Sequence, residues 1–318
     1  MRRLLALLLA SGLGFTGATV RAQSNVTRIV VPFGAGGVQD ILARAISPEL
    51  GAALGRSVIV ENRPGAGGTI GTASVAKAAP DGHTLILAAA SHTINGSLYA
   101  SLPYDPIRDF TGVAHIGTSG YVLMIGAALP AKTVAEFVSY ARANPGKLNY
   151  ATAGNGSATH LSMAYFAGLA GLDMVHVPYK ATGEAVSEVL AGRSHAVIAA
   201  NIGALPFAKD SRVRMLGVTS ARRSKFLPEL PTIAESGVPG YEFDTWFGLL
   251  GPAATPKAAV ESINAAVGTL LADPSILDRL AKQGVEPQAL NPGAFNALLR
   301  ADFARMAKVV KASGARVD

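Results

Sequence analysis

Short runs rich in β-branched residues alternate with longer Ala- and Leu-rich stretches along most of this 318-residue chain, and this alternation restricts its fold more than any other feature. Strand-helix-strand repeats of this kind are typical of parallel sheets that are covered by helices. The expected strands span residues 28–32, 57–61, 84–88, 148–151, 174–178, 196–200, 213–218 and 246–250. The clearest expected helices span residues 40–54, 134–144, 160–170, 183–191, 257–272, 275–283 and 292–313.

Two stretches are typical of passages between separate lobes. Residues 110–125 are mostly extended and interrupted by glycines, and residues 213–220 form a strand followed by a charged turn. Reading both as crossovers puts residues 23–120 and 221–318 in one lobe and residues 121–220 in the other. A chain of this length exceeds the usual size of a single core, so two lobes are expected. A hinge with two crossovers permits closure around a ligand.

The first 22 residues are typical of a secretory signal peptide. Arg2 and Arg3 precede an apolar run, and Val20 and Ala22 place small residues at the −3 and −1 positions of a cleavage site. The run is too short and too rich in Gly, Ser and Thr for a membrane span, which needs about 20 mostly apolar residues. The chain has no Cys, which excludes a lipid-anchored mature N-terminus. We therefore expect a periplasmic protein whose signal peptide is cleaved.

The composition also argues against several other classes of protein. The net charge is +7, but Lys and Arg are scattered and no basic run is interleaved with aromatic residues, so no nucleic-acid partner is expected. The six His show no metal-ligand spacing, and a zinc site is not expected without Cys. Gly117-Thr118-Ser119-Gly120 lacks the spacing of a nucleophile elbow. We expect a monomer that is not an enzyme and takes no metal or cofactor.

The first candidate binding loop is Pro32-Phe33-Gly34-Ala35-Gly36-Gly37-Val38-Gln39-Asp40, between an expected strand and an expected helix. Glycines let backbone N–H groups point outward, and the start of a helix adds unpaired donors and a partial positive charge. The loop therefore favours an anion. The third Gly of a dinucleotide fingerprint is missing, and a tight turn that merely needs glycine is an equal alternative. We interpret Asp40 as a helix N-cap.

A chemically similar loop, Ala153-Gly154-Asn155-Gly156-Ser157-Ala158-Thr159-His160, lies in the other expected lobe. Ser157 and Thr159 can cap the following helix or donate hydroxyl hydrogen bonds. If each lobe directs one helix start at the cleft, a carboxylate can lie between them and bind mainly to backbone dipoles. His160 is better explained as a brace of this loop than as a catalytic base.

Three further positions have a binding and a structural interpretation. Ser91 follows the third strand at its carboxyl end, where open α/β sheets place ligands. Tyr179 and Lys180 end another strand, and Lys180 is either a cation for a second carboxylate or a solvated strand-end residue. Residues 67–69, in a third Gly-rich loop, either reach the cleft rim or pack at a helix start.

Short motifs follow one another in order over nearly the whole mature chain. They include Val31-Pro32-Phe33, Glu61-Asn62-Arg63-Pro64-Gly65, Pro80-Asp81-Gly82, Val177-Pro178-Tyr179-Lys180, Leu230-Pro231-Thr232 and Trp246-Phe247-Gly248-Leu249. In this series the chain resembles the Bug-type receptors, the periplasmic substrate-binding proteins of the tripartite tricarboxylate transporter family. It departs from the family pattern at Val38-Gln39, where a hydroxyl residue is common, and at Ala164-Tyr165, near which the family has a Glu.

The resemblance implies an α/β type II periplasmic-binding-protein fold, with two Rossmann-like lobes joined by two crossover segments and a ligand cleft between them. It also implies that backbone amides and bridging waters of the two Gly-rich loops hold a ligand carboxylate. The expected ligand-binding residues combine positions that match the family's binding residues with the strand-end residues above. They are Phe33, Gly36, Gly37, Val38, Ser91, Gly154, Ser157, Thr159, His160, Tyr179 and Asn201.

The leading hypothesis is capture of a small organic carboxylate for delivery to a membrane permease of the tripartite tricarboxylate type. The ligand could be a di- or tricarboxylate, an amino acid or an aromatic acid. Two alternatives stay open at this point. One is a ligand-dependent co-sensor that is read by a membrane signalling receptor, and the other is an exported nucleotide-dependent α/β enzyme.

Overall fold

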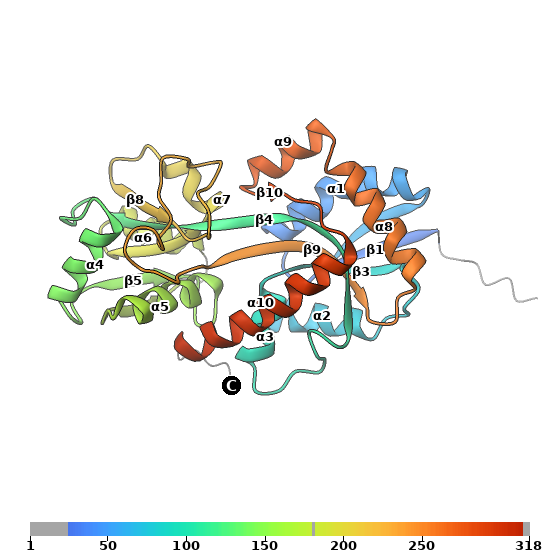
Figure 1. Cartoon of the computed structure of the whole chain (residues 1–318), viewed down its shortest axis with the longest axis horizontal. Helices are drawn as coiled ribbons and strands as arrows, with labels where there is room; N and C mark the ends of the chain where they lie inside the picture. Colours follow the sequence, from blue (N-terminus) through green and yellow to red (C-terminus); the bar gives the residue numbers. More distant parts are fainter. Residues whose placement is uncertain (1–24, 180–181, 314–318) are drawn as a thin grey trace, which may run out of the picture.

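Strand β4 (Phe110–Gly126) runs through both halves of the molecule and joins their sheets into one continuous path (Figure 1). The computed structural model describes residues 25–179 and 182–313. The strand order is β2-β1-β3-β9-β4-β7-β5-β6, and β8 and β10 also pair with β4. The extended stretch that the sequence predicts at residues 110–125 is therefore a single 17-residue strand that belongs to both lobes.

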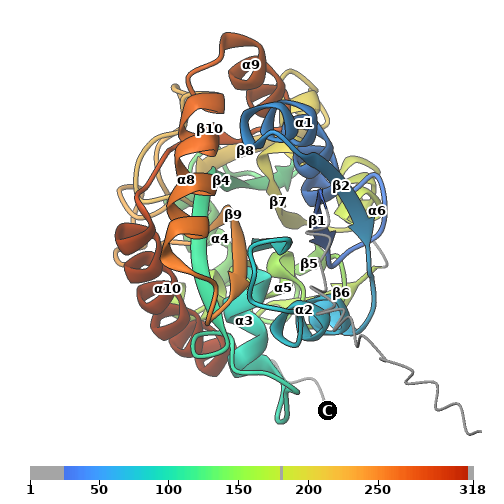
Figure 2. The ribbon, with the colours of Figure 1, turned by 90° about the vertical axis from the view of Figure 1, so that its right-hand side faces the viewer.

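Lobe one is built on a mixed sheet with helices on both faces. Strands β1, β2 and β3 are parallel, and β9 lies antiparallel between β3 and β4. Helices α1, α8 and α9 pack on one face, while α2, α3 and α10 pack on the other (Figure 2). The strands are β1 (Val26–Val31), β2 (Ser57–Asn62), β3 (Thr84–Ala89), β9 (Asp244–Pro252) and β10 (Glu286–Pro287). The helices are α1 (Val38–Leu54), α2 (Thr69–Ala76), α3 (Ser91–Leu98), α8 (Lys257–Leu270), α9 (Pro274–Lys282) and α10 (Pro292–Ser313).

Lobe two repeats the same architecture on a smaller scale. Strands β5, β6 and β7 are parallel, and β7 and β8 both lie antiparallel to β4. The strands are β5 (Asn149–Thr152), β6 (Val175–Pro178), β7 (Ala196–Ala200) and β8 (Val213–Val218). The helices are α4 (Val134–Ala143), α5 (Ala158–Ala170), α6 (Thr182–Leu190) and α7 (Asn201–Ala204). The α/β fold with two Rossmann-like lobes is as the sequence predicts.

The return from lobe two to lobe one follows a longer route than the sequence suggests. Most of residues 219–243 lies against lobe two, where the Ile233 N–H donates to the Val218 carbonyl and the Tyr241 hydroxyl donates to the Ser162 carbonyl at 3.1 Å. Near residue 225 the segment also touches lobe one, because the Lys225 N–H donates to Glu286 of β10 at 3.2 Å. The chain enters lobe one only at Asp244, where β9 begins. The division into residues 23–120 plus 221–318 and residues 121–220 remains a proposal, and these contacts favour a second boundary near residue 243.

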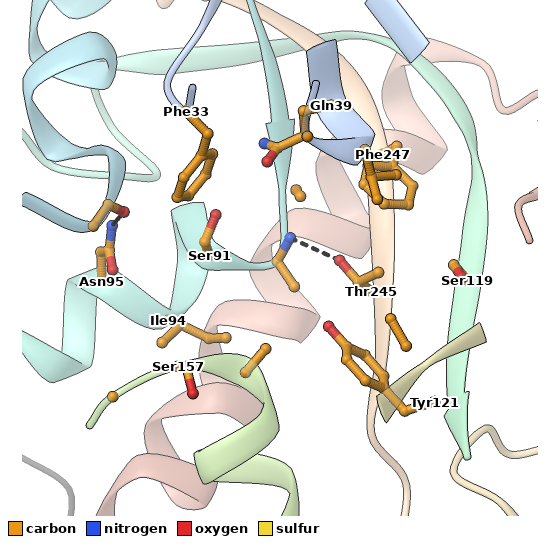
Figure 3. A pocket seen from close by; sticks show the side chains of 18 of the residues that line it. Phe33, Gln39, Ser91, Ile94, Asn95, Ser119, Tyr121, Ser157, Thr245 and Phe247 are labelled. Atoms are coloured by element: carbon orange, nitrogen blue, oxygen red, sulfur yellow. Dashed lines mark hydrogen bonds between the residues drawn. The ribbon is translucent and has the colours of Figure 1, made fainter. Parts of the chain in front are cut away.

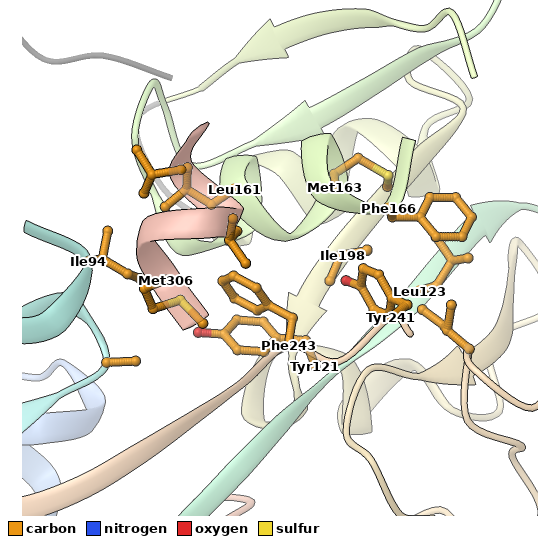
Figure 4. Packing of buried hydrophobic residues seen from close by; sticks show 14 of the residues in the cluster. Ile94, Tyr121, Leu123, Leu161, Met163, Phe166, Ile198, Tyr241, Phe243 and Met306 are labelled. Carbon is orange, nitrogen blue, oxygen red and sulfur yellow. The ribbon is translucent and has the colours of Figure 1, made fainter. Parts of the chain in front are cut away.

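Helix α10 packs against both lobes. It lies beside α3 of lobe one and α5 of lobe two, and crosses the molecule under β4 (Figure 1). Its Met306 belongs to the same buried cluster as Ile94 from α3, Leu161 from α5 and Phe243 from the second crossover (Figure 4). One hydrophobic core therefore extends across the boundary between the lobes.

A buried carboxylate on α10 ties this helix to lobe one. Asp302 is 4% exposed and accepts hydrogen bonds from the Thr93 hydroxyl at 2.6 Å and from the Trp246 indole N–H at 2.9 Å. Arg305 donates to Asp302 at 2.8 Å and to Asp244, at the start of β9, at 3.0 Å. Both carboxylates raise the pKa of Arg305, although burial alone would lower it. The network thus fixes α10 to the point where the second crossover ends.

We predict that Asp302→Ala lowers the free energy of unfolding by about 3 kcal/mol, because it leaves two buried donors without their acceptor and removes one of the acidic partners of the half-buried Arg305. Urea unfolding of the mature protein measures the loss. Asp278→Ala is the matched control, since it removes an acidic partner of the exposed Lys282 and should cost less than about 0.5 kcal/mol. Equal losses in the two variants would contradict this account of the network.

Candidate functional site

A cavity of about 610 Å³ lies between the lobes, at the carboxyl ends of their parallel strands (Figure 3). This is the position at which open α/β sheets bind ligands. Lobe one contributes the segments after β1 and β3, lobe two contributes the segments after β5 and β7, and the hinge strands β4 and β9 form a wall. The described lining residues are Phe33, Gly37, Val38, Gln39, Gly67, Ala89, Ala90, Ser91, Ile94, Asn95, Leu98, Tyr99, Ser119, Tyr121, Asn155, Gly156, Ser157, Ala158, Ala200, Ile202, Phe243, Thr245, Phe247 and Gln283.

The first Gly-rich loop delivers the start of α1 to this cavity. Gly36 has φ +82°, a left-handed conformation that glycine adopts without strain. Gly37 is the N-cap residue, and the helix begins at Val38. The backbone N–H groups of Val38 and Gln39 have no acceptor within the described residues. They are therefore free to bind an anion in the cavity.

Asp40 is not the N-cap, so that prediction was wrong. It is the third residue of α1, and its carboxylate reaches back to accept the Gly36 N–H at 2.9 Å. The Arg44 side chain donates to the same carboxylate, and this hydrogen bond is the main cause of its lowered pKa. Asn62 donates both to Asp40 at 2.9 Å and to the Phe33 carbonyl at 3.1 Å. Asp40 thus fixes the conformation of the loop without itself lining the cavity.

The second Gly-rich loop presents the start of α5 in a similar way. Ser157 is the N-cap, and its hydroxyl accepts the His160 N–H at 3.2 Å. The Thr159 hydroxyl accepts the Ala153 N–H at 2.8 Å, so this side chain braces the loop internally. The N–H groups of Ala158 and Thr159 have no acceptor among the residues that the structure describes. Each lobe therefore offers unpaired amides at a helix start.

His160 supports the second loop through its ring. Its Nδ1 accepts the Gly156 N–H at 3.1 Å, which requires that Nδ1 carry no proton. The ring stacks on His176 with centroids 4.1 Å apart, and His176 stacks in turn on Tyr150. Burial, and then the neighbouring His176, lowers the pKa of His160 to about 4. The loop is thus built around a neutral imidazole.

We predict that His160 makes the protein less stable in acid. The unfolded chain protonates His160 near its usual pKa of 6.5 and the folded chain only near 4, so the unfolded state binds more protons between these values. Stability should therefore fall as the pH decreases from about 7 towards 4. His160→Asn keeps an acceptor for the Gly156 N–H but cannot titrate.

Urea unfolding at pH 7.5 and pH 5.0 tests this prediction. The wild-type protein should lose about 1 kcal/mol more than His160→Asn between the two conditions, after allowance for the partial exposure of the ring. His176 also has a lowered pKa and remains in the variant, so some acid sensitivity should persist. The same loss in both proteins would show that His160 is not the cause.

The structure places some of the expected site residues in the cavity lining and others outside it. Phe33, Gly37, Val38, Ser91 and Ser157 line the cavity, and Gly67 of the third Gly-rich loop does so too. The expected residues outside the lining are Gly36, Gly154, Thr159, His160, Tyr179 and Asn201. The Tyr179 hydroxyl donates instead to Glu188 at 3.3 Å. Lys180 lies outside the described residues.

Asn201 faces a different cavity. Asn201 is 1% exposed and lines a space of about 490 Å³, whose other lining residues include the charged Arg222, Lys225, Asp244 and Glu286. The Asn201 Oδ1 is buried and has no hydrogen-bond partner within the described residues. Its place next to Ala200 and Ile202, which both line the first cavity, shows that the start of α7 separates the two spaces.

Sequence reasoning missed the wall that the hinge strands form. Ser119 and Tyr121 lie on one face of β4, and Thr245 and Phe247 lie on one face of β9 (Figure 3). In both strands the residues are two positions apart, which is the spacing of side chains on one face. This two-residue spacing was the available signal in the sequence. It did not reveal the wall, because β4 and β9 pair although they lie more than 120 residues apart along the chain.

The described residues that line the cavity carry no charged side chain. Among the described lining residues there is no Asp, Glu, Lys, Arg or His, and polar groups come only from hydroxyls, amides and the backbone. The described part of the chain also holds no cluster of three or more His, Asp or Glu side chains that could bind a metal ion. Among the described residues, positive potential in the cavity thus comes from the two helix starts.

Two lobes, an interlobe cavity and two helix starts that open into it define a solute-binding protein with the type II periplasmic-binding-protein fold. No helix within residues 25–179 and 182–313 has the length and apolar character needed to cross a membrane. The chain belongs to the family described as "Tripartite tricarboxylate transporter family receptor", which matches residues 42–315. This is a family of substrate receptors and not of enzymes.

Individual relatives agree with this assignment. A UPF0065 protein in the tcbD-tcbE intergenic region of Pseudomonas sp. (strain P51) is 37% identical over 316 residues, covering 97% of this chain and 93% of the relative. An R. palustris protein solved with adipate has a TM-score of 0.80 at 36% identity, covering 92% of this chain and 98% of that one. The periplasmic binding protein BugD has a TM-score of 0.77 at 32% identity over the same shares. The Bug-type resemblance is thereby confirmed.

Proposed function

We propose that this chain is a periplasmic solute-binding protein that captures a small organic carboxylate between its lobes and delivers it to a membrane permease of the tripartite tricarboxylate type. One observation carries the proposal: the starts of α1 and α5, one from each lobe, open into the same cavity with unpaired amides. The family assignment supports the partner, and the adipate in the R. palustris relative supports a carboxylate ligand.

The two helix starts are suited to a shared anion. Each carries the equivalent of about half a positive charge, concentrated on its first N–H groups. A carboxylate has two oxygens, so one can accept from the Val38 and Gln39 amides and the other from the Ala158 amide at the start of α5. An anion held in this way links both lobes, so binding favours the closed arrangement over the open one.

Backbone donors also suit a receptor that must exist without its ligand. A buried Arg or Lys would be left unpaired in the empty cavity, and an unpaired buried charge is costly. Amides at a helix start are neutral groups that water can solvate when the cleft opens. The absence of charge from the described lining is therefore consistent with reversible capture.

We infer that the chain does not convert its ligand. The described lining has hydroxyls and amides but no carboxylate, imidazole or amine that could act as a general base. Within the described lining, Ser91 and Ser157 therefore lack the general base that an activated nucleophile needs. His160, the base considered from the sequence, has Nδ1 engaged by the Gly156 N–H and lies outside the lining.

We also propose that residues 1–22 are removed on export, so that the mature chain starts at Gln23. These residues lie outside the described part of the chain, and their charged start, apolar run and small residues at the cleavage site support the proposal. The periplasmic relative BugD supports the same location. A monomeric mature protein remains a prediction.

The function predicts that carboxylates stabilise the mature protein. Thermal unfolding of residues 23–318 should be measured with di- and tricarboxylates, acidic amino acids and aromatic acids. A ligand at a hundred times its dissociation constant should add about 2.7 kcal/mol to the free energy of unfolding. If no carboxylate raises the melting temperature, the capture function is wrong.

The amide anchor can be tested with a proline at the first helical position. Val38→Pro removes only the Val38 N–H, because proline is well tolerated at this position and Gly37 already has the extended conformation that proline requires before it. A charge-assisted hydrogen bond contributes about 1.5–3 kcal/mol, so affinity for the carboxylate found above should fall by about tenfold or more. Isothermal calorimetry measures this loss.

Lys257→Pro is the matched control for that variant. Lys257 is the first residue of α8, follows a residue in an extended conformation, is exposed and lies outside the cavity lining. The substitution should leave affinity unchanged. Unaltered binding by Val38→Pro would exclude the start of α1 as the anchor, and equal losses in both variants would point to a general effect of proline.

A further inference from the structure

We propose that the ligand is a carboxylic acid whose body beyond the anchoring carboxylate is apolar, either an aromatic ring or an alkyl chain. Hydroxylated acids and tricarboxylates bind more weakly in the same cavity. This inference rests on the proposed function and names the class of ligand for that site. It is drawn from the side chains that surround the space away from the two helix starts.

Aromatic residues are concentrated around the cavity. The chain has eleven Phe, eight Tyr and one Trp, and three of the Phe and two of the Tyr line this space. They are Phe33, Tyr99, Tyr121, Phe243 and Phe247. They come from both hinge strands, from the second crossover and from lobe one, so the ligand body would meet rings on several sides. Such rings gain most from contact with a flat or extended apolar group.

Aliphatic side chains fill much of the remaining wall. Ile94 from α3 faces the cavity beside Ser91 (Figure 3). Leu98 from the same helix also lines it, as do Ala89 and Ala200, the last residues of β3 and β7. A body with several hydroxyl or carboxylate groups would have to give up its water against these carbon atoms. Polar groups that lose water without gaining a partner weaken binding.

Several polar side chains of the lining already donate to the protein itself. The Gln39 amide donates to the Leu87 carbonyl at 3.2 Å, and the Asn95 amide donates to the Gly67 carbonyl at 3.0 Å. The Thr245 hydroxyl accepts the Ala90 N–H and donates to the Trp246 carbonyl. The Ser157 hydroxyl donates to the Gly154 carbonyl at 2.7 Å. These bonds reduce the donors that the four side chains offer to extra oxygen atoms on the ligand, and the Ser91 and Tyr121 hydroxyls are among the lining donors that remain.

Charge leads to the same conclusion. A second or third carboxylate inside the cavity would find no cationic side chain among the described lining residues. The start of each helix already serves the first carboxylate. An additional buried anion without a cation is strongly unfavourable, whereas a ring or alkyl chain in its place loses nothing.

Calorimetric titration of the mature protein, residues 23–318, tests the inference. The probes are 3-phenylpropionate and hexanoate, which carry one carboxylate on an apolar body, and malate and citrate, which carry polar bodies. We expect 3-phenylpropionate or hexanoate to bind at least about tenfold more tightly than malate and citrate, a difference that one or two unpaired polar groups produce. The uncharged 3-phenylpropanamide tests the carboxylate anchor separately.

The outcomes separate this inference from the proposed function. Malate or citrate binding as tightly as the apolar acids would overturn the inference while leaving carboxylate capture in place. If neither these four acids nor the wider carboxylate set binds, both fail. If 3-phenylpropanamide binds as tightly as 3-phenylpropionate, the apolar body is supported but the carboxylate anchor of the proposed function is wrong.

A pair of variants tests the aromatic lining directly. Phe33 is half-buried on the first Gly-rich loop and packs against Gly68, so Phe33→Ala should leave the fold intact. Its affinity for 3-phenylpropionate should fall by about tenfold, with little change for malate. Phe226→Ala removes a similarly half-buried Phe outside the cavity and should change neither affinity. Unchanged binding of 3-phenylpropionate by Phe33→Ala would contradict a role for this ring.

Discussion

Within the described lining of the interlobe cavity, backbone dipoles are the source of positive potential, and the construction of both Gly-rich loops follows from this. The first amides of α1 and α5 can remain free only if the other polar groups of each loop find partners away from the cavity. Asp40, with Arg44 and Asn62 behind it, meets this need in lobe one. Thr159 and His160 meet it in lobe two. The residues that shape the anchor are therefore mostly not the residues that touch the cavity.

The far wall of the cavity belongs to the segments that connect the lobes. Tyr121 lies on β4, and Phe243 and Thr245 lie where the second crossover becomes β9. A ligand body packed here contacts the parts of the chain that must bend when the lobes move. In the proposed function, the two helix starts bind the carboxylate, while the connecting strands contact the rest of the ligand. In this proposal, recognition of the ligand and closure of the lobes thus depend on the same side chains.

The alternation of strands and helices predicted the two-lobed α/β fold, and the glycines after β1 and β5 predicted which loops face each other. These features depend on residues that are close together in the sequence. The wall of Ser119, Tyr121, Thr245 and Phe247 was not predicted, because it requires the pairing of two distant strands. The prediction that Asp40 is the N-cap was wrong because the helix begins two residues earlier than expected. Whether Asn201 faced the cleft depended on the direction of α7, which the pattern of residues did not specify.

The single core beneath α10 affects how such a molecule can diversify. Met306 packs with Ile94 of one lobe and Leu161 of the other, and Asp302 with Arg305 attaches the same helix to β9. Neither lobe is therefore a self-sufficient module that recombination could exchange between relatives. A transplanted lobe would expose part of its interior unless α10 changed with it. New ligand preferences are more readily acquired by replacing single side chains around the cavity, where the scaffold is left untouched.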